Sequence, residues 1–178
     1  LSTTIKNILD LAWIGAENAS LSDNHFNLSD TLAELKEIAV KLAAQKHIIL
    51  KGEITSGIEV GGAEDKISRA VLNIIDNAIK YTPTGGSVTM ILSKKKGKAV
   101  IEVKDTGIGI PEKELERIFE RFYRGSKAAK TLGSGLGLAI TQGIVKAYRG
   151  EIHVTSKVDK GSLVLITFPL FQKSLMSS

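Results

Sequence analysis

The sequence predicts a single α/β domain of mixed helices and strands, and two kinds of pattern support this. Apolar residues recur at spacings of three and four over several segments, which is typical of helices with one buried face. Two other regions each contain a pair of short strand-like runs around a tight turn, which predicts hairpins. The length of 178 residues fits one domain with an additional element at one end.

Composition narrows the class of protein. Hydrophobic residues make up 43% of the chain, and with only 5% aromatic residues the core must consist of Ile, Leu, Val and Ala. The net charge of +5 fits a phosphate-bearing ligand or an acidic partner, although such values are common among ordinary domains. The absence of Cys excludes disulfides and thiolate metal sites and indicates a reducing compartment.

The sequence also bears on location. No apolar run approaches the ~20 residues of a membrane-spanning helix, and no signal peptide is present. We therefore expect a cytoplasmic domain without direct membrane contact. The chain starts at Leu1 and not at Met, so we expect it to be part of a longer protein.

The first elements are predicted from helical periodicity and short alternating runs. Residues 1–18 read as an amphipathic helix and residues 19–24 as a polar loop. Phe26 and Leu28 alternate with polar residues in a short strand, and Ser29 is a suitable N-cap for the next helix. That helix runs to about residue 45, and short strands are expected at 48–50 and 58–60, with a turn at 55–57 between them. The residues of this helix that we expect to face inward are Leu32, Leu35, Ile38, Ala39 and Leu42.

The remaining elements alternate between helices and hairpins. A helix over 65–81 is ended by Pro83 and two glycines, and a hairpin with strands 87–93 and 99–105 follows. The lysine-rich turn at 94–98 has no interleaved aromatic residues, so we interpret it as a solvated tip and not as a nucleic-acid site. Pro111 opens a short helical stretch to residue 122, and a polar loop covers residues 123–134. A helix then runs to about residue 149, a closing hairpin pairs 151–157 with 162–170, and the tail after residue 171 is expected to be disordered.

A polar stripe lies on the predicted helix over 65–81. Asn73, Asn77 and Lys80 recur at spacings of three and four beside an apolar face of the same helix. An amide removed from water without a partner costs on the order of 1–3 kcal/mol, so these groups need partners. An amide oxygen can ligate Mg²⁺, and Lys80 can meet a phosphate. The alternative is that both asparagines bond to neighbouring loops.

Two glycine-containing segments supply further candidate binding groups. Asp105 ends a buried strand and can accept from an exocyclic amine such as N6 of adenine, while Gly109 lets a flat base lie against the backbone; the alternative is a common Asp-Gly turn. The glycines of residues 133–137 precede a helix, whose free N–H groups favour phosphate. This loop matches neither the dinucleotide fingerprint nor a P-loop, and alone it is explained equally well as a tight helix entry.

In order and spacing, these segments resemble the motifs of sensor histidine kinases. Residues 73–81, 105–110, 119–123 and 133–138 are similar to the N, G1, F and G2 boxes, and Gly161-Ser162 is similar to the final glycine motif. The resemblance covers roughly residues 26–170 and implies a Bergerat-type ATP-binding fold. This fold is a two-layer sandwich with a mixed, mainly antiparallel sheet and helices on one face. The implied division is the end of a dimerisation-hairpin helix at 1–20, the catalytic ATP-binding domain at 21–171 and a tail at 172–178.

The resemblance also implies ATP and Mg²⁺ as cofactors and a role for each matching residue. Asn77 is the implied metal ligand, Asp105 holds the adenine amine, and Asn73, Lys80 and Arg124 are the implied catalytic residues. Residues 123–134 become a lid over the phosphates, with Phe119 and Phe122 as apolar anchors. The implied nucleotide-binding residues are Asn73, Asn77, Lys80, Tyr81, Asp105, Gly107, Gly109, Ile110, Phe122, Gly133, Ser134, Gly135, Leu136, Gly137 and Leu138.

The resemblance sets limits on what this chain can do alone. The family phosphorylates a histidine in a His-Glu-Leu-Arg-like run, and none of His25, His47 and His153 has those neighbours. We therefore expect the phosphoacceptor on a dimerisation domain outside this chain. We further expect a monomeric fragment, a homodimeric parent that is a bacterial inner-membrane sensor, and a response regulator receiver domain as the downstream partner.

Three alternative functions fit the same fold or ligand. ATPases of the gyrase, chaperone and mismatch-repair type carry a Glu base at the position of Asn73, and an amide cannot act as that base. A serine kinase of the anti-sigma type would not need the predicted helix at 1–18. A nucleotide-binding module without catalysis would not need the intact set of Asn77, Asp105 and glycines.

Overall fold

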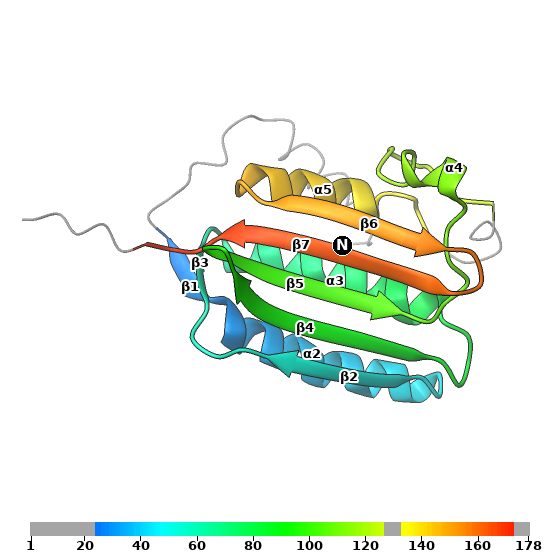
Figure 1. The fold of residues 1–178 in the computed structure, drawn as a ribbon, viewed down its shortest axis with the longest axis horizontal. Helices are drawn as coiled ribbons and strands as arrows, with labels where there is room; N and C mark the ends of the chain where they lie inside the picture. The colour runs from blue at the N-terminus through cyan, green and yellow to red at the C-terminus, as the bar shows by residue number, and fades with distance from the viewer. Residues whose placement is uncertain (1–23, 127–132, 173–178) are drawn as a thin grey trace, which may run out of the picture.

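The structure is a computed structural model that describes residues 24–126 and 133–172, and its helices α2, α3 and α5 cover one face of a sheet (Figure 1). The described strands are β1 (His25–Asn27), β2 (Ile49–Ile54), β3 (Glu59–Gly61), β4 (Ser87–Lys95), β5 (Lys98–Asp105), β6 (Glu151–Lys157) and β7 (Gly161–Pro169). The described helices are α2 (Leu28–Gln45), α3 (Glu64–Tyr81), α4 (Glu112–Leu115) and α5 (Gly137–Ala147). The helix predicted at 1–18, nearly all of the loop at 19–24, the centre of the loop at 123–134 and the tail from residue 173 lie outside the described residues.

The main sheet has five strands in the order β2-β4-β5-β7-β6. Strands β2 and β4 are parallel, and every other neighbouring pair is antiparallel, which confirms the prediction of a mixed, mainly antiparallel sheet. Strands β5 and β6 end where β4 and β7 begin, because Val88 is opposite Asp105 and Lys157 is opposite Gly161. Several turns of the chain therefore lie at this end of the sheet.

The first hairpin is longer than its predicted strands. Lys94 and Lys95 pair with Ala99 and Lys98, so only Lys96 and Gly97 remain in the turn. Both turn residues have positive φ values, 49° and 74°, as a two-residue turn that matches the strand twist requires. The small sheet of β1 and β3 is separate, although Val60 of β3 bridges to Leu170 beyond β7.

Helix α3 lies at the centre of the helical layer. Its apolar stripe is buried against the sheet, and it packs against both α2 and α5. The buried residues of α3 are Ile67, Ala70, Val71, Ile74, Ile75, Ala78 and Ile79. The face beside this stripe carries the polar residues that the sequence singles out, so core packing fixes their direction.

The start of α2 corrects two predictions. Leu28 is not in the strand but begins the helix, and Asn27 caps it by accepting the Asp30 backbone N–H with its side-chain oxygen at 3.2 Å. Ser29 is not the cap. Its hydroxyl donates to the Thr55 carbonyl at 2.6 Å and accepts from the Ile58 backbone N–H at 2.9 Å, so it ties α2 to the segment after β2.

The inward face of α2 is narrower than predicted. Leu32 and Ala39 are fully buried, but Ile38 is 51% exposed and Leu42 is 41% exposed. Helix α2 covers the edge of the sheet at β2, so among the described elements its packing partners lie along one stripe. Ile38 lies one position, about 100°, away from Ala39 around the helix and leaves that stripe.

Candidate functional site

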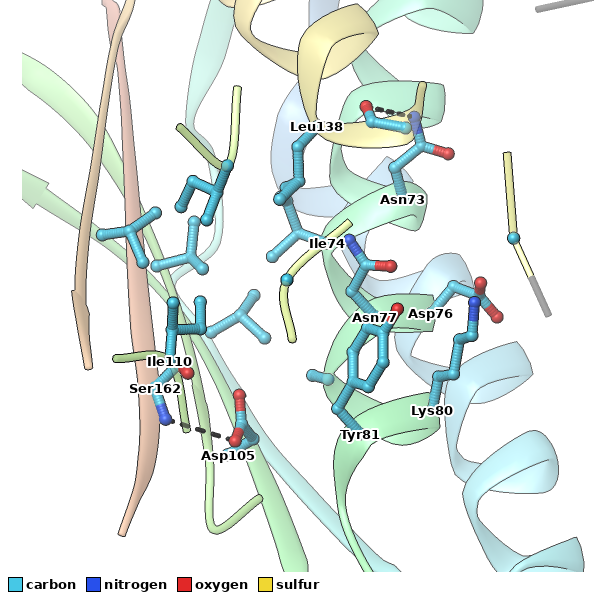
Figure 2. A pocket seen from close by; sticks show the side chains of 18 of the residues that line it. Asn73, Ile74, Asp76, Asn77, Lys80, Tyr81, Asp105, Ile110, Leu138 and Ser162 are labelled. Carbon is cyan, nitrogen blue, oxygen red and sulfur yellow. Dashed lines mark hydrogen bonds between the residues drawn. The ribbon is translucent and has the colours of Figure 1, made fainter. Parts of the chain in front are cut away.

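A cavity of about 820 Å³ lies beside α3 at the end of the sheet where β5 ends. Its walls come from α3, the loop after Asp105, the segments on either side of residues 127–132, and β6 and β7. Figure 2 shows Asn73, Asn77, Lys80 and Tyr81 on α3, with Asp105, Ile110 and Ser162 across the space from them. The predicted site residues that line it are Asn73, Asn77, Lys80, Tyr81, Asp105, Gly109, Ile110, Arg124, Gly133, Ser134, Gly135, Gly137 and Leu138.

The two asparagines of α3 have different surroundings. The Asn73 side-chain amide donates to the Gly137 carbonyl at 3.2 Å and approaches the Thr141 hydroxyl at 3.4 Å, so it joins α3 to the start of α5. Thr141 is fully buried, and its hydroxyl donates to the Ala70 carbonyl of α3 at 3.3 Å. Within the described residues no hydrogen bond is recorded for the Asn77 side chain, which lines the cavity. Asn77 is therefore the amide of this pair whose oxygen and nitrogen are both left for a ligand, whereas Asn73 uses its nitrogen on α5.

Asp105 is a buried carboxyl group at the end of β5, only 8% exposed. Its Oδ1 accepts the Gly107 backbone N–H at 2.8 Å and the Ser162 backbone N–H at 3.2 Å. Burial raises the pKa of Asp105 above its ordinary value, while these two hydrogen bonds oppose the shift. One oxygen thus fixes the side chain, and the other is left for a donor in the cavity.

The loop after Asp105 rests directly on the turn between β6 and β7. The Asp159 backbone N–H donates to the Ile108 carbonyl at 2.9 Å, and the Ile110 backbone N–H donates to the Ser156 hydroxyl at 2.8 Å. Gly109 has a φ of 66°, and a Cβ there would lie 2.1 Å from the Lys157 carbonyl oxygen. Only glycine permits this approach, which gives a reason for the residue other than contact with a base.

The glycine segment before α5 meets the cavity at the start of that helix. Its cap residue, Leu136, makes no side-chain cap hydrogen bond, so the first N–H groups of α5 are left for other acceptors. A Cβ on Gly133 would lie 2.7 Å from Nζ of Lys80, which places the amine next to this backbone. A helix start and an amine at one end of a cavity suit an anionic group.

Three predicted site residues do not line the cavity. Gly107 tightens the turn that holds Asp105, and Leu136 is 1% exposed within the core. Phe122 is 67% exposed and has a φ of 64°, so the expectation that it packs as an apolar anchor is wrong. The Phe122 backbone N–H donates to the Gly135 carbonyl at 3.0 Å, so the backbone is held here while the side chain stays largely exposed.

Glu114 and Ser156 are two of the residues at the site that were not predicted. Glu114 of α4 is 7% exposed, lines the cavity and accepts the Ser126 hydroxyl at 2.6 Å as well as the Ser126 backbone N–H. No sequence signal distinguishes it from the exposed Glu112 and Glu116 nearby. Ser156 on β6 contacts the loop after Asp105, and the alternation along that strand places it on the less exposed face.

In the described ranges, no three His, Cys, Asp or Glu side chains gather as a metal cluster. No helix among these residues is long and apolar enough to cross a membrane.

Comparison with known proteins identifies the family to which this fold belongs. Residues 62–172 match the family of histidine kinase-, DNA gyrase B- and HSP90-like ATPases, and the chain belongs to this family. The curated relative RppB, a sensor histidine kinase of Synechocystis sp., is 40% identical over 181 residues, which cover 100% of this chain and 40% of RppB. Sensor histidine kinase WalK of Bacillus subtilis is 46% identical over 110 residues, or 60% of this chain and 18% of WalK.

Solved structures agree with these relatives. The mycobacterial sensor histidine kinase MprB superposes with a TM-score of 0.72 at 29% identity, covering 83% of this chain and 98% of that one. Full-length ShkA in complex with AMPPNP gives a TM-score of 0.82 at 26% identity, covering 95% of this chain and 35% of ShkA. The resemblance read from the motifs is confirmed, and the family indicates nucleotide use. The chain spans less than half the length of RppB and WalK, so it corresponds to part of such proteins.

Proposed function

We propose that this domain binds Mg-ATP and transfers the γ-phosphate to a histidine on a dimerisation hairpin of its parent protein. The observation that carries the proposal is the division of labour on α3. The side chain at position 73 is an amide and not a carboxylate, and Asn73 donates a hydrogen bond to the Gly137 carbonyl of α5. Asn77 presents a free amide oxygen to the cavity. An amide cannot take a proton from water, so this arrangement favours transfer to a protein group over hydrolysis.

The residues present fit ATP and Mg²⁺. Asp105 and the loop to Ile110 suit the base, and the start of α5 with Lys80 suits the phosphates. Asn77 would supply an oxygen ligand to Mg²⁺, which also takes water and phosphate oxygens and therefore needs no cluster of carboxylates. When bound, Mg²⁺ neutralises phosphate charge; Lys80 and Arg124 would orient the phosphate chain and add positive charge beside it.

The ATPase alternative loses support at Asn73. A water-activating base would have to replace Asn73, and a carboxylate there would face the Gly137 carbonyl, which is also an acceptor. A serine kinase remains compatible with the described residues, so the phosphoacceptor must be tested directly. For the parent, a homodimer, a membrane location and a response regulator receiver domain as partner are part of the same proposal.

The proposal predicts that Mg-ATP binds in the micromolar range, roughly −7 to −8 kcal/mol, and that Asn77→Ala weakens binding markedly. Calorimetric titration with and without Mg²⁺ measures this, and Asn24→Ala, an exposed site away from the cavity, is the matched control. Affinity that does not depend on Mg²⁺ in the wild type would contradict the metal role of Asn77.

Transfer is tested by adding the dimerisation hairpin of the parent as a separate protein with labelled ATP. We expect acid-labile label on its histidine. Intact ATP binding with no label on the hairpin would refute the transfer and leave a nucleotide-binding module.

A further inference from the structure

The hydroxyl of Ser156 lies behind the cavity wall and makes three contacts. It is 2.8 Å from the Ile110 backbone nitrogen, 2.9 Å from the Gly161 carbonyl oxygen and 2.8 Å from the Ser162 hydroxyl. Ser156 does not line the cavity, whereas Ser162 does. The Ser156 hydroxyl therefore connects the loop after Asp105 to Ser162, which lines the cavity.

Counting protons settles the direction of each bond. A hydroxyl has one proton and two lone pairs. The Ile110 N–H can only donate and the Gly161 carbonyl can only accept, so Ser156 uses one lone pair on Ile110 and its proton on Gly161. The remaining lone pair faces Ser162, and Ser162 must be the donor in that contact. With its proton used in this way, the Ser162 oxygen presents only lone pairs to the cavity.

Asp105 is restricted in a similar way. Its Oδ1 is occupied by two backbone N–H groups, from Gly107 and from Ser162 itself. A carboxylate with both oxygens free could accept two adjacent N–H groups of an oxopurine such as guanine, but here a single oxygen is left. This wall of the cavity therefore offers the carboxylate Oδ2 and the Ser162 hydroxyl oxygen, and both are acceptors.

We propose that Ser156 makes the site selective for an aminopurine over an oxopurine by holding the Ser162 hydroxyl as an acceptor. An exocyclic amine brings N–H donors to this pair of acceptors, whereas a carbonyl at the same position brings lone pairs and leaves the acceptor that faces it, the Ser162 oxygen, unpaired. Ser156 is thus a positioning residue that acts through Ser162. The inference rests on the proposed nucleotide binding and names what sets its base selectivity.

The test compares ATP with inosine triphosphate (ITP), which has a carbonyl in place of the amine at the purine 6-position and a proton on the adjacent N1, and which shares the phosphate chain. Wild-type protein should prefer Mg-ATP by on the order of 100-fold. In Ser156→Ala the Ser162 proton is released and can turn toward a carbonyl, so the preference should fall roughly tenfold, mainly through tighter ITP binding. Ser156→Thr keeps the hydroxyl and should restore the preference, and Thr155→Ala, on the exposed face of β6, should not change it.

The other possible results bear directly on the role of Ser156 in base selectivity. An unchanged preference in Ser156→Ala, or a parallel loss of both nucleotides, would overturn the inference, because a purely structural role weakens both alike. If Ser156→Ala does not fold, Ser162→Ala serves instead: it keeps the backbone N–H to Asp105 and should also lower the preference, and an unchanged ratio would overturn the inference. A wild type that binds both nucleotides equally refutes the selectivity alone, whereas one that binds neither refutes the proposed function.

Discussion

At the scale of single residues, the site depends on side chains in which one polar atom bonds within the protein and another is left for a ligand. Asp105 uses one oxygen to hold its own position and leaves the other for a ligand. Asn73 spends its amide N–H on α5, whereas Asn77, one turn further along α3, is directed to the cavity. Residue type and spacing alone do not separate such roles, because the partners come from distant parts of the chain.

Asp105→Asn should weaken Mg-ATP binding roughly 10- to 100-fold, as expected for loss of a hydrogen bond to a charged group. The amide oxygen would stay on the Gly107 and Ser162 N–H groups, so the amide NH₂ would face the amine of the base. Calorimetric titration against wild type measures the loss, and Asp30→Asn, an exposed carboxyl on α2 that does not line the cavity, is the control. Undiminished affinity in Asp105→Asn would contradict the assignment of the base to this end of the cavity.

The same variant should change how stability depends on pH. The folded pKa of Asp105 is raised, so the folded state keeps this proton to higher pH than the unfolded chain. The resulting stabilisation is fully present below the unfolded pKa of about 3.9 and is lost as pH rises through the raised folded pKa. The free energy of unfolding of Asp105→Asn should therefore rise relative to wild type across this window, as measured by urea unfolding. Parallel pH curves would contradict the raised pKa.

At the scale of elements, most helices and strands could be predicted from the sequence, but which of their apolar side chains are buried could not. Helix α3 has a strong periodic pattern, and its predicted bounds of 65–81 differ by one residue from the observed Glu64–Tyr81. Its apolar stripe also determines which face of the helix is buried. Helix α2 shows the limit. Ile38 and Leu42 continue its apolar pattern, yet they are exposed because none of the elements within residues 24–126 and 133–172 packs on that side. Whether a partner exists for an apolar position is a property of the tertiary arrangement, not of the helix.

Glu114→Ala should loosen the backbone at Ser126. This carboxylate accepts both the hydroxyl and the backbone N–H of Ser126, and losing a charged acceptor from buried surroundings costs about 1–3 kcal/mol. We expect amide hydrogen exchange at Ser126 to be roughly tenfold faster or more, measured by NMR. Glu112→Ala, an exposed residue on the same turn of α4, should leave this rate unchanged. Equal rates in Glu114→Ala and wild type would show that Ser126 is held by other contacts.

At the scale of the whole molecule, the site is formed where sequence-distant turns meet at one end of the sheet. The motifs could be recognised from the sequence because they are short and occur in a fixed order. The contact between the loop after Asp105 and the β6–β7 turn could not be predicted in this way. The loop after Asp105 and the β6–β7 turn are about 50 residues apart and touch through backbone atoms. Gly161 presses on this junction from the other side, since a Cβ there would lie 1.9 Å from the Asp105 carbonyl oxygen. Backbone contacts of this kind leave no mark in sequence except the glycines themselves.

This junction gives a prediction that separates backbone strain from steric contact. Gly109 and Gly57 have similar φ values, 66° and 72°, so alanine should strain the backbone equally at both, by about 1–2 kcal/mol. Gly57 has no atom within 4 Å of its added Cβ, whereas Gly109 would meet the Lys157 carbonyl. Gly57→Ala should therefore lose only the strain energy and bind Mg-ATP normally. Gly109→Ala should lose more stability in urea unfolding and bind Mg-ATP at least tenfold more weakly, because the loop must move off the β6–β7 turn. Equal losses in the two variants would mean that the loop and the turn can separate without affecting the cavity.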